Sequence, residues 1–237
     1  MYTDWGPEVW IWIAIGAVAL ILLRLAFPVI RLARSFARMH RVRRLQAWAA
    51  ARGLSFTSAS SGDLAGRFPE FDWSFPLVGS LTFSVMEGQW QGQSFIGFDQ
   101  YQLREGLDGE SPKHVLSGVI LSSSVPLKPL LIRPQALADK VAAALGWEDI
   151  NLESAEFSRR FHVSAPDRRW AYDVIHPRTM ELLLASPPFC VRFGLVHAMA
   201  YRTRPLRPRD FELAAELLRG ILDGLPDYVV RQQMGQG

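Results

Sequence analysis

The hydrophobic and polar positions follow different patterns on either side of residue 53. Val9–Leu23 is a run of 15 uncharged residues. At 1.5 Å per residue it forms about 22 Å of helix, less than the roughly 30 Å hydrocarbon core of a bilayer. Extending the run to Ile30 gives 22 residues and places Arg24 near the far end, where its long side chain can reach the headgroups. The pattern predicts a transmembrane helix over residues 9–30, after a short external N-terminus over residues 1–8.

Arginines dominate the next segment, and the helical period continues through it. Apolar residues recur at steps of three or four between Leu32 and Ala49, which predicts a basic juxtamembrane helix over residues 31–53 with Gly53 as its stop. The candidate membrane-interface residues are Arg24, Arg31, Arg34, Arg38, Arg41, Arg43 and Arg44. Each is expected to contribute about 1 kcal/mol of attraction to anionic lipid headgroups. A specific lipid site or a site for a partner helix is the alternative for this segment.

The orientation follows from the same arginines, because they come after the apolar run and none precedes it. Lysine and arginine beside a span favour the cytoplasmic side. The sequence therefore predicts a single-pass protein of the cell (inner) membrane, with its N-terminus outside and residues 31–237 in the cytoplasm. A signal peptide is disfavoured because Asp4 and Glu8 precede the run and large basic residues follow it. An interfacial helix would need a polar face, which residues 9–23 lack.

Residues 54–237 mix strand and helix patterns without strict alternation. After an irregular connector over residues 54–80, strands are expected at 81–88 and 93–102 (a hairpin), 115–123, 150–153, 161–164, and 190–194 with 198–203 (a second hairpin). Helices are expected at 134–145, 155–160 (capped by Ser154), 168–174 (capped by Asp167), 178–185 and 208–222. Residues 103–113 are typical of an exposed loop, and two prolines favour an edge or extended segment at 125–132. This arrangement predicts an α+β domain with an antiparallel sheet and packed helices.

Composition supports a folded domain, and the charge distribution removes one class of partner. The chain is 49% hydrophobic and 21% charged, which is typical of a protein with a packed core. Its net charge is +3, but eight arginines and two acids lie in residues 1–52, which leaves −3 for residues 53–237. We therefore expect no nucleic-acid partner. The single cysteine, Cys190, cannot form an internal disulfide and is expected to be a buried thiol.

Motifs for catalysis or cofactor binding do not stand out. The five histidines lack metal-ligand spacing, and no GxSxG, GxGxxG or Walker pattern occurs, so we expect no cofactor and no metal. The favoured function is a membrane-tethered binding or scaffold domain whose partners are the lipid bilayer and another membrane protein. The alternative is a membrane-tethered hydrolase that combines His114 with Asp99 and Ser122–Ser124, for which the sequence supplies no geometry.

One stretch of the domain resembles a pattern in bacterial families of unknown function. It comprises Asp149–Val163 (DINLESAEFSRRFHV), Asp167–Tyr172 (DRRWAY), Pro177 and Met180. The similarity covers about residues 145–205 well and the earlier hairpin weakly. Such families look like membrane-associated proteins with a cytoplasmic α+β domain, and the resemblance implies this architecture without implying any activity.

The same stretch also has a purely structural explanation. Phe157 and Phe161 have the spacing of core residues, and Ser154 and Asp167 that of helix caps. Two acids, Glu153 and Glu156, are placed to pair with neighbouring arginines, which are Arg159, Arg160, Arg168 and Arg169. Exposed pairs of this kind contribute about 0–1 kcal/mol each, so the pattern alone does not indicate a functional site.

Overall fold

The computed structural model describes residues 7–58, 64–71, 80–104, 111–135 and 147–235. The chain divides into two compact units, Met1–Arg44 and Leu45–Gly237. Helix α1 (Pro7–Ala50) has 44 residues and is about 66 Å long at 1.5 Å per residue. The predicted segments 9–30 and 31–53 therefore belong to one continuous helix, which Gly53 follows at a φ of +67°, as expected for a residue just beyond a helix C-terminus.

The membrane-spanning segment predicted over residues 9–30 remains a prediction. Among the residues that the structure describes, we find no helix with the length and apolar character that crossing a membrane requires. Most side chains of residues 9–30 lie outside the described part of the chain. Residues 1–6, which make up most of the predicted external N-terminus, lie outside it as well.

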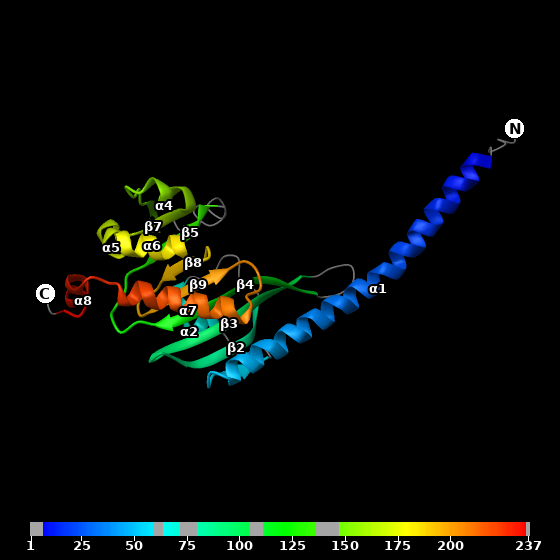
Figure 1. The fold of residues 1–237 in the computed structure, drawn as a ribbon. Helices are drawn as coiled ribbons and strands as arrows, with labels where there is room; N and C mark the ends of the chain where they lie inside the picture. Colours follow the sequence, from blue (N-terminus) through cyan, green and yellow to red (C-terminus); the bar gives the residue numbers. More distant parts are fainter. Residues whose placement is uncertain (1–6, 59–63, 72–79, 105–110, 136–146, 236–237) are drawn as a thin grey trace. The chain divides into compact units, whose positions relative to one another are not determined.

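A single antiparallel sheet organises the second unit (Figure 1). Its nine strands follow the order β1-β2-β3-β4-β9-β8-β5-β7-β6. They are β1 (Ser55–Thr57), β2 (Ser80–Trp90), β3 (Gln93–Arg104), β4 (Ser111–Ser122), β5 (Leu130–Pro134), β6 (Glu148–Asp149), β7 (Phe161–Ala165), β8 (Cys190–Phe193) and β9 (His197–Arg202). Every pair of neighbouring strands runs antiparallel.

Helices pack on this sheet and complete the α+β class that the sequence predicts. They are α2 (Leu64–Arg67), the 3-10 helix η1 (Pro69–Phe71), α4 (Ala155–Arg160), α5 (Arg168–Val174), α6 (Pro177–Ala185), α7 (Pro208–Asp223) and α8 (Asp227–Gln233). Helix α7 packs on β4 and β9, while α4 and α5 pack on β7 and α6 packs on α4 and α7 (Figure 1). The α+β class with an antiparallel sheet and packed helices is confirmed.

Two apolar clusters cover the opposite faces of the sheet. Successive residues of a strand point to opposite faces, and on β3 Phe95 belongs to one cluster and Ile96 to the other. The larger cluster includes Phe211 and the other apolar residues of α7. The smaller one includes Phe68 and Phe71, which α2 and η1 bring against the sheet. The smaller cluster therefore covers its face of the sheet at strands β2, β3, β4 and β9.

The last turns of α1 belong to the larger cluster. Leu45 and Ala49 are fully buried there and Trp48 is 8% exposed. The Trp48 ring lies 6.0 Å from the rings of Trp90 and Phe211, centroid to centroid, and its Nε1–H donates a 2.9 Å hydrogen bond to a Glu212 carboxylate oxygen. The second unit thus begins at Leu45, several residues before the boundary at 53–54 that the sequence suggests.

Elements with a clear period or cap lie where the sequence places them. The first hairpin is confirmed as β2 and β3, although its turn is the two-residue Gln91–Gly92, at φ of +48° and +87°, rather than a four-residue turn. Two positive φ angles are typical of a type I′ turn, whose twist matches that of the strands. The expected elements over 115–123, 155–160, 161–164, 168–174, 178–185, the second hairpin and 208–222 are also found.

The expectation for residues 125–132 is wrong, because β5 is an interior strand between β8 and β7. Pro126 and Pro129 both precede β5, which begins at Leu130, so neither removes a donor from the ladder. Pro134 is the last residue of β5 and pairs with Phe161, so it does not start the helix expected over 134–145. Residues 136–146 lie outside the described part of the chain.

Two further boundaries and one helix differ from expectation. The strand expected at 150–153 is found earlier in the chain, as β6 at Glu148–Asp149. Ile150 N still donates to Val163 O at 2.9 Å, and the chain then leaves the sheet. The loop expected over 103–113 is shorter, since the pairing of β3 with β4 extends to Arg104 and Ser111. Residues 105–110 lie outside the described part. Helix α8, which follows Pro226, was not predicted.

Candidate functional site

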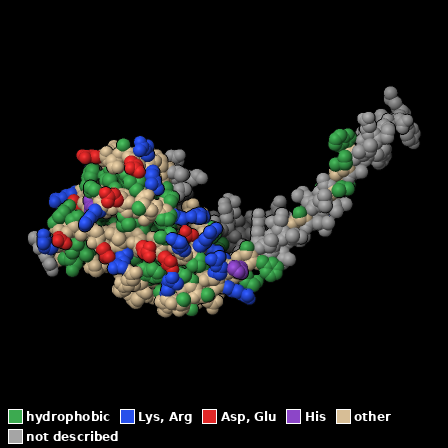
Figure 2. Space-filling view, viewed as in Figure 1, with side chains coloured by type: hydrophobic (Ala, Val, Ile, Leu, Met, Phe, Trp, Pro, Cys, Tyr) green, Lys and Arg blue, Asp and Glu red, His purple; other side chains and the backbone are tan. Residues whose placement is uncertain are grey.

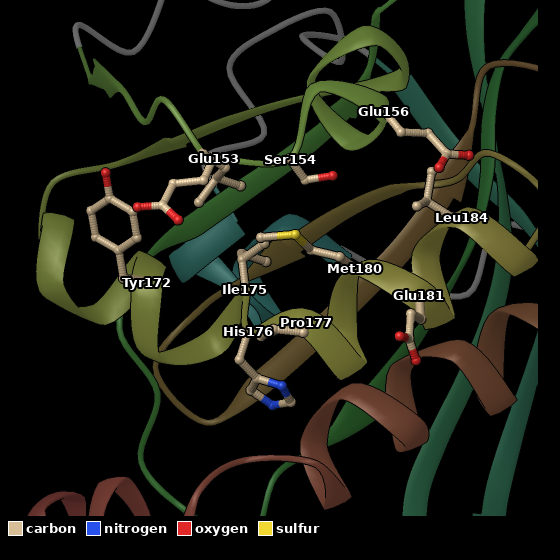
Figure 3. Close-up of a pocket in the computed structure, with 11 residues that line it drawn as sticks. Glu153, Ser154, Glu156, Tyr172, Ile175, His176, Pro177, Met180, Glu181 and Leu184 are labelled. Carbon is tan, nitrogen blue, oxygen red and sulfur yellow. The ribbon is translucent and has the colours of Figure 1, made fainter.

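A groove of about 690 Å³ lies beside helices α4, α5 and α6 (Figure 3). Its size falls within the range of typical ligand sites, about 300–1,000 Å³. It is lined by the segment before α4, by the start of that helix, and by parts of α5 and α6. The lining residues are Leu152, Glu153, Ser154, Glu156, Tyr172, Ile175, His176, Pro177, Met180, Glu181 and Leu184.

Local capping chemistry places the three helices around the groove. Ser154 Oγ accepts a 3.3 Å hydrogen bond from Phe157 N and so begins α4. Asp167 Oδ1 accepts a 3.1 Å hydrogen bond from Trp170 N at the start of α5. Pro177 occupies the first turn of α6, where its missing N–H costs no helical hydrogen bond. Short helices with defined starts therefore fix the walls of the groove.

The floor of the groove is apolar. Ile175 is buried, while Leu152, Met180 and Leu184 are half-buried. Figure 3 shows the Met180 side chain, from α6, reaching across the middle of the view between Ser154 and His176. Half-buried apolar side chains of this kind gain stability when a partner covers them, at roughly 25 cal/mol per Å².

The rim carries three glutamates, Glu153, Glu156 and Glu181, and all three are exposed. The sequence suggests that the first two pair with neighbouring arginines, but no such ion pair is found among the described residues. Two arginines at the groove are engaged otherwise. Arg160 Nη1 donates to Leu184 O at 3.0 Å, and Arg168 Nη2 lies 3.4 Å from the Tyr172 hydroxyl.

The remaining polar groups of the groove have structural partners. The His176 ring lies on the side of α6 away from Glu153 and Ser154 (Figure 3). Its Nε2 is 2.8 Å from Gly224 O and 3.3 Å from Thr179 Oγ1. Tyr172 Oη donates a 2.9 Å hydrogen bond to Asn151 O. With Ser154 acting as a cap, the described lining offers no hydroxyl activated by a histidine.

The hydrolytic set that the sequence offers is not assembled. His114 and Ser122 both lie on β4, eight residues apart, which separates them by roughly 27 Å along an extended strand. Asp99 is buried and accepts a hydrogen bond from the Ser117 hydroxyl. Ser123 Oγ bonds Val125 in a local turn, where Ser124 also lies. The side chain of His114 lies outside the described part of the chain.

The candidate membrane-interface arginines all lie on α1. Arg24, Arg43 and Arg44 are exposed, and Arg41 is half-buried. The side chains of Arg31, Arg34 and Arg38 lie outside the described part. Exposure is what contact with headgroups requires, but lipid contact itself stays a prediction for the whole set.

Two strand residues carry a thiol and a phenol whose pKa values are raised by burial. Cys190 is 3% exposed, which confirms the expected buried thiol, and burial raises the pKa of this thiol to about 12. Burial likewise raises the pKa of the Tyr201 phenol, which pairs with Cys190 across β8 and β9. Both groups are therefore neutral at physiological pH. Within the described ranges, no group of three or more potential metal ligands is found.

A second hollow, of about 460 Å³, lies near the start of α7 and includes Arg202 and Asp210. Arg202 Nε donates to Pro188 O at 3.0 Å, and its guanidinium lies 3.7 Å from Asp210 Oδ1 and 4.0 Å from the centre of the Phe189 ring. Desolvation lowers the pKa of this guanidinium. Because Arg202 is already held by three groups, it anchors the start of α7.

No known protein family matches the chain, and no curated protein matches it. Among solved structures, the chain is similar to the crystal structure of the mycobacterial trehalose monomycolate transport factor A, TtfA. The two are 13% identical with a TM-score of 0.56, over 77% of this chain and 92% of TtfA. The shared feature is the fold. The groove itself was missed from the sequence, although several of its lining residues belong to the stretch singled out there, namely Leu152, Glu153, Ser154, Glu156, Tyr172, Pro177 and Met180.

Proposed function

We propose that the chain is a membrane-tethered binding domain that holds a protein partner in the groove beside α4, α5 and α6. The observation that carries the proposal is the lining of the groove, with a half-buried apolar floor and exposed, unpaired carboxylates among the described residues. Apolar surface surrounded by polar groups is the usual composition of a recognition site. The scaffold function and the membrane partner remain the favoured hypothesis.

The proposed tether rests on sequence and on the length of α1. The 22-residue segment 9–30, in which Arg24 is the single charged residue, and the arginines after it favour a single span with the folded unit on the cytoplasmic side. The 44-residue helix α1 is long enough to contain such a span. TtfA, which shares the fold, is named as a transport factor, and this supports a role as an accessory component rather than a catalyst.

Site-specific photocrosslinking in intact cells tests the binding function. A benzophenone amino acid replaces Tyr172, which is 41% exposed at the groove, or Leu195, which is 58% exposed in the turn between β8 and β9 and does not line it. We expect a discrete protein adduct from position 172 and not from position 195. No adduct at 172, or the same adducts from both positions, would contradict binding in the groove.

Extraction and topology tests address the tether separately. We expect the full chain to stay with membranes after carbonate washing, and a cytoplasm-specific reporter fused after Gly237 to be active. Release of the chain by carbonate would contradict the proposed tether, and a reporter active only outside the cell would contradict the proposed orientation. Neither result depends on what the groove binds.

A further inference from the structure

The charge at the groove identifies the kind of molecule that fits it. Glu153, Glu156 and Glu181 place three negative charges around an apolar floor, and low-dielectric walls concentrate the field of such charges. Arg160 and Arg168 at its edge donate to Leu184 O and to the Tyr172 hydroxyl. Because both acceptors are neutral, the two guanidiniums keep their charge, and three carboxylates against two guanidiniums leave one net negative charge among these side chains. The site therefore favours cations and disfavours anionic lipids and fatty acids, whose charged groups the carboxylates repel.

The floor adds a second requirement. Leu152, Met180 and Leu184 present half-buried apolar surface, so an ion or a small hydrophilic cation would leave this surface uncovered. Methionine adapts its shape to different apolar partners. A helix with apolar residues at i, i+3, i+4 and i+7 and basic residues beside them meets both requirements, and helix-in-groove binding is a common recognition mode.

We infer that the groove binds a basic amphipathic helix of the type that adjoins the cytoplasmic end of a transmembrane span in another membrane protein. This inference rests on the proposed function, because a domain tethered on the cytoplasmic side meets neighbours that carry an excess of lysine and arginine there. The positive-inside rule thus supplies the occupant's charge, and the acidic rim of the groove is complementary to it.

The test uses the full chain in nanodiscs of phosphatidylcholine, a lipid without net charge. The probe is a fluorescent 18-residue model helix with leucine at i, i+3, i+4 and i+7 positions and lysine elsewhere. A second probe has glutamate at every lysine position. Fluorescence anisotropy is measured against empty nanodiscs, so that binding to lipid is subtracted.

Matched triple variants separate the groove from overall charge. Glu153→Gln with Glu156→Gln and Glu181→Gln neutralises the groove. Glu216→Gln with Asp223→Asn and Asp227→Asn removes the same charge from exposed positions on α7 and α8. We expect the groove triple to weaken binding of the lysine probe about tenfold, equal to about 1.4 kcal/mol, and the control triple to change it less than twofold. Added salt should weaken binding by the wild type.

The outcomes distinguish this inference from the proposed function. Equal binding of both probes, or equal loss in both triples, overturns the inference. An adduct at position 172 without binding of the lysine probe leaves the groove as a binding site and overturns the basic helix as its occupant. Self-association of the full chain that the groove triple abolishes would assign the groove to a second copy, and that too overturns the inference.

Discussion

Asp167 uses both of its carboxylate oxygens to hold α5 in place. Oδ1 accepts the 3.1 Å hydrogen bond from Trp170 N, and Oδ2 lies 2.7 Å from Lys128 Nζ. Loss of an N-cap costs about 1 kcal/mol, within a range of 0.5–2, and an exposed ion pair contributes about 0–1 kcal/mol. We therefore expect Asp167→Ala to destabilise the fold by about 1–2 kcal/mol. Asp167→Asn keeps a capping oxygen and should cost less than about 1 kcal/mol.

Urea unfolding followed by circular dichroism measures both variants. With a slope of about 1–3 kcal/mol per molar urea, Asp167→Ala should lower the midpoint by roughly half a molar. Lys128→Ala alone should destabilise the fold about as much as Asp167→Asn does. The double variant of these two should be only slightly less stable than either single variant, because both substitutions remove the same ion pair. Equal losses in Asp167→Ala and Asp167→Asn would refute the capping argument.

The dependence on pH gives an independent check. The Lys128 ammonium and the Trp170 N–H lower the pKa of the Asp167 carboxyl below its ordinary 3.8. A lowered pKa means that the ionised carboxylate stabilises the folded state above the unfolded pKa of about 3.9, and this contribution is lost as pH falls through the folded pKa. The difference between wild type and Asp167→Asn should be constant from pH 5 to 8 and should shrink progressively as the pH falls below about 4. A difference that does not shrink below pH 4 would contradict the assigned cause.

Two further predictions concern the sheet. Gly194→Ala would place a Cβ against the Cβ and Cγ of Glu70, whose Oε1 lies 2.8 Å from His197 Nδ1. We expect a loss of about 1–3 kcal/mol in thermal unfolding, and Glu70→Ala should relieve part of it; additive losses would contradict this explanation. Cys190, buried with a thiol pKa of about 12, should not react with a disulfide-exchange reagent at pH 8 until the chain is unfolded in guanidinium. Stoichiometric labelling of the folded chain would show that the thiol is accessible.

The sequence predicts elements best where a local signal is complete. Ser154 and Asp167 cap α4 and α5 as expected because a cap needs only its own side chain and the N–H groups of the next turn. Gly92 likewise marks the first hairpin. The strand order is harder to predict from the sequence, because the pairing of β5 with β8 joins residues some sixty positions apart. A run with prolines, such as residues 125–132, then looks like an edge although the strand begins after them.

The groove could not be predicted from the sequence for the same reason. Its residues come from the segment before α4 and from three helices, and each has an ordinary local explanation as a cap, a core residue or a surface acid. Glu153 and Glu156 looked like partners for nearby arginines. In the structure, Arg160 donates a hydrogen bond to a backbone carbonyl and Arg168 to a tyrosine hydroxyl. Only the tertiary arrangement shows that the carboxylates surround a common apolar surface.

The burial of Trp48 has a consequence for how the chain is made. Trp48 and its partner Glu212 are 164 positions apart, and at about 5–20 residues per second the ribosome needs roughly 8–33 s to synthesise the intervening chain. Throughout that interval the C-terminal turns of α1 present Leu45, Trp48 and Ala49 without the helix that finally covers them. The nascent protein therefore depends on completing α7 before its first helix can be locked in place, and a stalled or shortened chain would expose an aromatic surface prone to aggregation.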